Sequence, residues 1–112
     1  MCGIAGFSGF KGDSASIIAR MVGSLVHRGP DDEGVLVAGS AAVGMRRLSI
    51  IDVAHGKQPI ATQDGNLSVV FNGEIYNHAD IRRELEALGC VFQTQSDTEV
   101  VLQGYKIWGA DC

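Results

Sequence analysis

The chain has 112 residues, a net charge of −4 and an apolar fraction of 46%, which limits it to at most one domain with a small core. Its acidic pI, near 5.2, and the lack of a basic run argue against nucleic acid or an anionic membrane as a partner. No apolar stretch approaches the length of a membrane span, and the N-terminus has no signal-peptide pattern.

The cysteines predict neither a disulfide framework nor a metal centre. Cys2, Cys90 and Cys112 are odd in number and widely spaced. No zinc-ligand spacing combines them with the three histidines. We therefore expect a soluble, cytoplasmic protein with free thiols and no metal.

The first part of the chain predicts a strand, a helix and a pair of strands. Residues 2–9 form a short strand, and Asp13 or Ser14 can cap a helix that extends to about Val26. The apolar stripe of this helix comprises Ile17, Ile18, Met21, Val22 and Leu25. Residues 34–38 and 41–45 then form two strands joined by a tight turn.

The second part predicts a hairpin followed by two helices. Residues 59–62 and 67–71 flank an Asp-Gly pair, which is a hairpin signal. A helix from Asn77 or His78 to Leu88, a strand at residues 91–94 and a helix from Ser96 through Trp108 follow. The side chains expected in the core are Ile81, Leu85 and Leu88 on the first helix, and Val100, Val101, Leu102, Tyr105 and Trp108 on the second. This order of elements predicts an α+β fold with a mainly antiparallel sheet.

Cys2, directly after the initiator methionine, is the first candidate for chemistry. Methionine removal favours a small second residue, so the mature chain can begin with a thiol and a free α-amine on one residue. Reference pKa values of about 7.7–8.0 for the amine and about 8.5 for the thiol let the amine act as base to the thiol. Gly3 and Gly6 leave the thiol open to close approach. The alternative is that Cys2 simply begins a buried strand.

Several polar stretches further along have both a structural and a functional interpretation. Asn72-Gly73 is either a tight turn with positive φ or a side-chain amide and a backbone N–H presented together, as in an oxyanion hole. Arg46-Arg47 is either a solvated edge or the source of a guanidinium that clamps a carboxylate. The charged loop at residues 27–32 is either plain surface or a loop near a site.

The last candidate is Asp97, in a stretch that matches a capping box. In that motif Ser96 bonds a backbone N–H in the first turn, and Glu99 reaches back to the backbone N–H of Ser96. Asp97 then either favours the positive end of the helix dipole or faces a pocket and holds an ammonium group.

Taken together, five stretches resemble the N-terminal glutaminase domain of glutamine-hydrolysing asparagine synthetases. They are Met1–Phe7, His27–Asp31, Arg47–Asp52, Phe71–Asn77 and Ser96–Glu99. The resemblance implies a class II glutamine amidotransferase with part of an N-terminal nucleophile (Ntn) hydrolase fold, whose layers run αββα. Glutaminases of glucosamine-phosphate synthases and purine-pathway amidotransferases share the Cys2 start and an Asn-Gly pair, whereas residues 47–52 resemble the asparagine synthetase branch.

The resemblance also implies a role for each candidate residue. Cys2 would attack the side-chain amide of L-glutamine, with its own α-amine as base, to give a thioester and ammonia. Asn72 and Gly73 would form the oxyanion hole. The implied substrate-binding residues are Arg47 for the α-carboxylate and Asp97 for the α-ammonium, with Glu74 close by.

The family's glutaminase domain is longer than this chain, so residues 1–112 are expected to be its N-terminal part. The synthetase domain, which would bind ATP and magnesium and receive the ammonia, is expected to lie outside it. Unpaired sheet edges would then favour a homo-oligomer. Two alternatives stay open: a non-catalytic binding or interaction module, and the glutaminase of another class II amidotransferase. A papain-like pair formed by Cys2 and His27 is not favoured, because nothing places His27 beside Cys2 and the α-amine already supplies a base.

Overall fold

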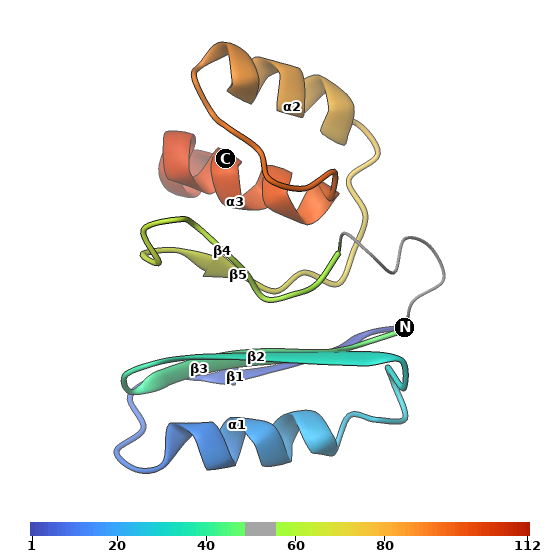
Figure 1. The fold of residues 1–112 in the computed structure, drawn as a ribbon, viewed down its shortest axis with the longest axis vertical. Helices are drawn as coiled ribbons and strands as arrows, with labels where there is room; N and C mark the ends of the chain where they lie inside the picture. The colour runs from blue at the N-terminus through green and yellow to red at the C-terminus, as the bar shows by residue number, and fades with distance from the viewer. Residues whose placement is uncertain (49–55) are drawn as a thin grey trace.

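The computed structural model describes residues 1–48 and 56–112, which form layers of helix and sheet. The elements are β1 Gly3–Phe7, α1 Ser14–Gly23, β2 Asp32–Ala38, β3 Ala41–Arg47, β4 Ile60–Ala61, β5 Ser68–Val69, α2 His78–Ala87, α3 Asp97–Trp108 and the 3-10 turn η1 Gly109–Asp111. In Figure 1 α1 covers one face of the sheet β1–β3–β2, the β4–β5 hairpin follows, and α3 and α2 form the far layer. This α+β arrangement confirms the predicted fold class and is consistent with a partial Ntn-hydrolase fold.

The three-stranded sheet is antiparallel and has β3 at its centre. β1 pairs with β3 from Gly3 opposite Arg46 to Phe7 opposite Ala42. Because side chains alternate along a strand, Ala42 and its neighbours of the same parity face α1. There they pack with Ile18 and Val22, which are almost fully buried on the predicted stripe. Met45, also fully buried, has the opposite parity, so both faces of β3 are covered.

Helix α1 begins as predicted and ends earlier than predicted. The Asp13 side chain caps it by accepting a hydrogen bond from the backbone N–H of Ser16 at 3.1 Å. The helix ends at Gly23 and not near Val26, because the chain then tightens into turns that bring Gly29 onto β3. A Cβ on Gly29 would lie 2.4 Å from the backbone carbon of Arg46, so only glycine permits this approach.

The β4–β5 hairpin confirms the Asp-Gly signal, although each strand has two residues and the prediction was longer. Gly65 has a φ of 72° in the turn. The Asp64 carboxylate accepts a hydrogen bond from the Thr62 hydroxyl at 2.6 Å and another from the Asn66 backbone N–H at 3.0 Å. These bonds, led by that of Thr62, lower the pKa of the exposed Asp64 carboxyl below its usual value.

The strand predicted at residues 91–94 is wrong, and so is half of the predicted capping box. The Ser96 side chain does cap α3, by accepting from the Thr98 backbone N–H at 3.1 Å. The carboxylate of Glu99, however, accepts from the backbone N–H of Gln93 at 2.8 Å and from the N–H and the hydroxyl of Thr94, both at 2.6 Å. The polar groups of this segment are therefore satisfied by a side chain and not by a sheet partner.

Two side chains predicted in the core lie at the surface. Leu85, Val100 and Leu102 are buried as expected, whereas Leu88 is 55% exposed and Tyr105 is 48% exposed. Leu88 is the residue at which α2 ends, just before Gly89 turns the chain away with a φ of 94°. Tyr105 borders an open apolar groove between α3 and β5.

None of the helices within residues 1–48 and 56–112 has the length and apolar character needed to cross a bilayer.

Candidate functional site

The site begins where the N-terminus meets the segment that leads from β5 to α2. The side-chain amide of Asn72 donates a hydrogen bond to the carbonyl oxygen of Cys2 at 3.3 Å. These residues are 70 positions apart in the chain, and in Figure 1 the N-terminus lies at the end of the sheet next to this segment. The structure thus brings together the predicted nucleophile and the predicted oxyanion-hole residue, which come from different halves of the molecule.

A second donor reaches the same carbonyl from the charged loop that follows α1. The Nε of Arg28 donates to the Cys2 oxygen at 3.3 Å. The loop is held against β3, because Gly29 packs on the backbone of Arg46 and Arg47. The interpretation of this loop as one near a site is therefore supported, although the sequence did not single out Arg28.

The two neighbouring arginines have different environments. Arg46 forms an ion pair with Glu33 at 2.5 Å, and its Nε donates to the Gly29 oxygen at 2.9 Å. Arg47 is half-buried and donates to the Gly56 carbonyl oxygen. The β1–β3 register, extended by one residue from Gly3 opposite Arg46, puts Cys2 opposite Arg47. Of the pair, Arg47 is thus the one opposite Cys2, and its predicted binding of a carboxylate stays a prediction. The rest of its motif, residues 49–52, lies outside the described residues.

Asp97, at the start of α3, contacts the backbone of the Asn72 segment. Its Oδ2 accepts a hydrogen bond from the backbone N–H of Ile75 at 3.0 Å. Ile75 directly follows Glu74, which is exposed. The carboxylate therefore does more than favour the helix dipole: it fixes the end of the segment that carries the other candidate residues.

Gly73 does not form the tight turn with positive φ that an Asn-Gly pair favours. Its role here is steric, because a Cβ on Gly73 would lie 2.7 Å from the Phe71 ring. A glycine lets the Phe71 ring cover the backbone at this point.

Gln58 also contacts this region, although no local sequence pattern predicts a role for it. Its side-chain oxygen accepts from the Phe71 backbone N–H at 2.6 Å, and its side-chain nitrogen donates to the Thr98 hydroxyl at 3.1 Å. Both contacts join segments distant in sequence, and only the folded chain brings them together.

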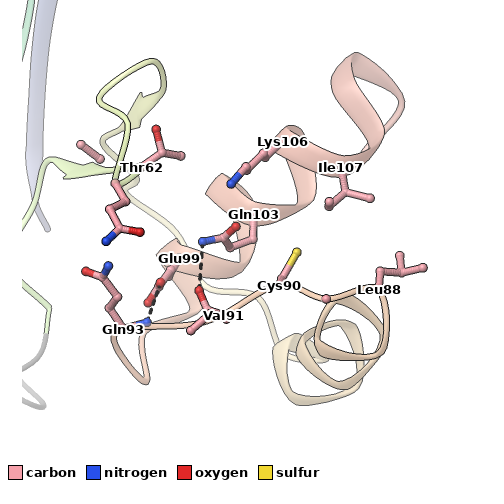
Figure 2. Close-up of a pocket in the computed structure, with 12 residues that line it drawn as sticks. Thr62, Leu88, Cys90, Val91, Gln93, Glu99, Gln103, Lys106 and Ile107 are labelled. Atoms are coloured by element: carbon pink, nitrogen blue, oxygen red, sulfur yellow. Dashed lines mark hydrogen bonds between the residues drawn. The ribbon is translucent and has the colours of Figure 1, made fainter.

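A separate cavity of about 280 Å³ lies between the hairpin, the α2–α3 connection and α3. Figure 2 shows the Cys90 thiol and the Gln103 amide pointing into it, with Glu99 bonded to the backbone of Gln93 at its edge. Gln103 donates to the Val91 carbonyl at 3.5 Å. None of the six predicted site residues lines this cavity, so the predicted chemistry does not involve it.

Comparisons with known proteins identify the family of this chain. A family model described as a glutamine amidotransferase domain matches residues 1–112, so the chain belongs to that family. Within the family it is similar to glutamine-hydrolysing asparagine synthetases. Asparagine synthetase 1 of Bacillus subtilis (strain 168) is 48% identical over 94 residues, which cover 84% of this chain and 15% of that protein.

Other relatives match nearly the whole chain. Asparagine synthetase 3 of Bacillus subtilis (strain 168) is 41% identical over 100% of this chain and 19% of its own length. Asparagine synthetase 1 of Arabidopsis thaliana is 39% identical over 99% of this chain and 19% of its own length. The chain thus spans less than a fifth of the length of these curated relatives. It resembles their glutaminase part, as its sequence motifs predict.

Proposed function

We propose that this chain hydrolyses the side-chain amide of L-glutamine, with Cys2 as nucleophile. The observation that carries the proposal is the hydrogen bond between the Asn72 side chain and the Cys2 carbonyl, which brings a donor amide beside the proposed nucleophile. The membership in the glutamine amidotransferase family supports the same reaction.

The nucleophile requires removal of Met1, which is 76% exposed and open to an aminopeptidase. The freed α-amine of Cys2 takes the thiol proton, and the sulfur attacks the amide carbon of glutamine. The C–N bond then breaks, ammonia leaves with a proton from the α-ammonium, and a thioester remains. Water attacks the thioester, which releases glutamate and restores the thiol.

Asn72 and Gly73 are the proposed donors to the oxyanion of the tetrahedral intermediate. A primary amide has two N–H groups, so Asn72 can keep one on the Cys2 carbonyl and turn the other to the oxyanion. The backbone N–H of Gly73 supplies the second donor. Such fixed donors act where negative charge develops, and one of them contributes about 10²–10³ in rate.

The two ends of free glutamine would be held by opposite charges. Arg47 has five donors and, among the described residues, uses one of them on Gly56; the other donors of its fork would bind the α-carboxylate. Asp97 uses one oxygen on Ile75, so the other can bind the α-ammonium. Glu74, exposed and two residues after Asn72, adds negative charge at the same end.

The wider setting follows from the asparagine synthetase relatives and is also proposed. In a longer parent protein a synthetase domain would use the ammonia to amidate aspartate with ATP and magnesium, in the cytoplasm. Another class II amidotransferase would use the same glutaminase with a different acceptor. Self-association through strand edges stays a prediction, and sedimentation that shows only monomer would contradict it.

Intact mass before and after treatment with an electrophilic glutamine analogue, 6-diazo-5-oxo-L-norleucine, tests the reaction. The expected result is a chain that lacks Met1 and gains one adduct, which Cys2→Ala does not gain. A chain that lacks Met1 and gains no adduct would contradict catalysis. Calorimetry of Cys2→Ala with glutamine would then separate a binding module, which releases or takes up heat, from a chain without a glutamine pocket.

A further inference from the structure

We propose that Gln58 is a positioning residue for the Asn72–Gly73 donor pair, and that the first turn of α3 holds this pair from both sides. The inference rests on the proposed function for its catalytic meaning. Its structural content can be tested without activity.

The first anchor is the Gln58 side chain, which uses both ends of its amide. Its oxygen accepts from the Phe71 backbone N–H at 2.6 Å, immediately before Asn72. Its nitrogen donates to the hydroxyl of Thr98 at 3.1 Å, and Thr98 is only 2% exposed in the first turn of α3. A partly buried amide that is hydrogen-bonded at both ends has one preferred orientation. The Gln58 side chain therefore fixes the position of the Phe71 backbone relative to α3.

The second anchor is Asp97, the residue before Thr98. It accepts from the Ile75 backbone N–H at 3.0 Å. Phe71 and Ile75 bracket the three residues at 72–74, which carry the proposed oxyanion donors and Glu74. Two adjacent residues of α3 therefore fix both ends of the segment.

The backbone of Gln58 contacts the other half of the molecule. A Cβ on Gly34 would lie 1.8 Å from the Gln58 carbonyl oxygen, so β2 and residue 58 are in direct backbone contact. β2 belongs to the sheet whose other edge strand, β1, follows Cys2. Gln58 thus touches the sheet that carries the nucleophile and the segment that carries the oxyanion donors, and it sets the spacing between them.

Loss of the Gln58 amide should loosen residues 71–73 more than the rest of the chain. In Gln58→Met, which keeps the length of the side chain, hydrogen exchange at the Phe71 amide should rise about tenfold, as expected for one lost hydrogen bond. The matched control is Gln103→Met, whose amide makes one long bond to Val91. It should leave exchange at the Phe71 amide unchanged.

Thr98 gives a second pair of variants if Gln58→Met fails to fold. Thr98→Val keeps the shape and removes the hydroxyl, and should raise exchange at Phe71. Thr98→Ser keeps the hydroxyl and should restore the protection. Equal exchange at the Phe71 amide in Thr98→Val and the unchanged chain would overturn the inference.

The catalytic consequence has its own measurement. Gln58→Met should lower the rate of glutamate release, or of adduct formation with 6-diazo-5-oxo-L-norleucine, by about tenfold, with little change in the KM for glutamine. An unchanged rate in a variant with faster exchange at the Phe71 amide would show that Gln58 orders the segment without affecting catalysis, which contradicts the positioning role. If the unchanged chain forms no adduct, the proposed function fails, and the exchange experiment still decides the structural part.

Discussion

The half of the molecule built on the three-stranded sheet and the half built on α2, α3 and the hairpin are stabilised by different kinds of hydrogen bond. In the first half, continuous backbone ladders join β1, β3 and β2. In the second, the strands have two residues each, and the side chain of Glu99 takes the place of a strand partner for residues 93–94. The first half can therefore be predicted from strand patterns, whereas the second depends on individual side chains.

The proposed site lies at the interface between these halves. Cys2 and Arg47 come from the sheet, and Asn72, Gly73 and Asp97 come from the other half. The Asn72–Cys2 bond and the contact of Gln58 with Gly34 connect them. Activity should thus be most sensitive to changes at this interface.

The largest expected effect is on catalysis. Asn72→Ala removes the side-chain donor and should lower the rate of glutamine hydrolysis by about 10²–10³, because a fixed oxyanion donor is lost. Steady-state assay of glutamate release measures this effect. Asn66→Ala, in the hairpin turn, is the control and should keep the rate. A full rate in Asn72→Ala would exclude the oxyanion role.

The second-largest expected effect is a loss of stability, caused by a steric clash at the interface between the two halves. Gly34→Ala puts a Cβ 1.8 Å from the Gln58 oxygen and must displace one of the two backbones. We expect a loss of about 3 kcal/mol in the free energy of unfolding, the upper part of the range for overpacking. Denaturant titration gives this value. Gly23→Ala, at a position with nothing within 4 Å of the added Cβ, should be neutral or slightly stabilising.

A smaller effect is expected from the side chain that replaces a strand partner. Glu99→Gln removes the charge from a carboxylate that is 3% exposed and accepts three hydrogen bonds. Charge-assisted hydrogen bonds of this kind contribute about 1.5–3 kcal/mol each. The single amide oxygen of glutamine cannot accept all three. We therefore expect a loss of about 2 kcal/mol in the free energy of unfolding. Thermal unfolding measures the loss, with the exposed Glu84→Gln as the control. Equal melting temperatures would show that residues 93–94 do not need the carboxylate.

The smallest expected effect is on the pH dependence of the melting temperature, through Asp64 in the turn of the β4–β5 hairpin. Because the hydrogen bond from Thr62 lowers the pKa of Asp64 in the folded chain, Asp64 stabilises the fold above its usual pKa of 3.8, and this contribution is lost as the pH falls through the lowered folded value. Asp64→Asn should therefore lower the melting temperature slightly at neutral pH, where the carboxylate contributes, and flatten the acid limb of a plot of melting temperature against pH, because the variant has no such contribution to lose. An acid limb of the same slope in both proteins would contradict the assignment.

Much of the fold could be predicted because its signals are local. The cap at Asp13, the cap at Ser96 and the Asp-Gly turn each depend on residues within a few positions of one another. The motifs likewise predict the Cys2–Asn72 pair, since they mark which residues carry chemistry. The strand at residues 91–94 was wrong because an apolar run does not show whether its backbone N–H groups will meet a strand or a carboxylate.

The sequence by itself thus determined most of the elements, their order and the family, because period, caps and motifs are read along the chain. The tertiary structure alone decided where the longer polar side chains make their hydrogen bonds. Arg28 donates to Cys2, Gln58 joins Phe71 to Thr98, and Glu99 binds the backbone before α3. These partners lie up to 40 residues from one another, and a hydrogen bond depends on distance in space, which only the packed chain sets.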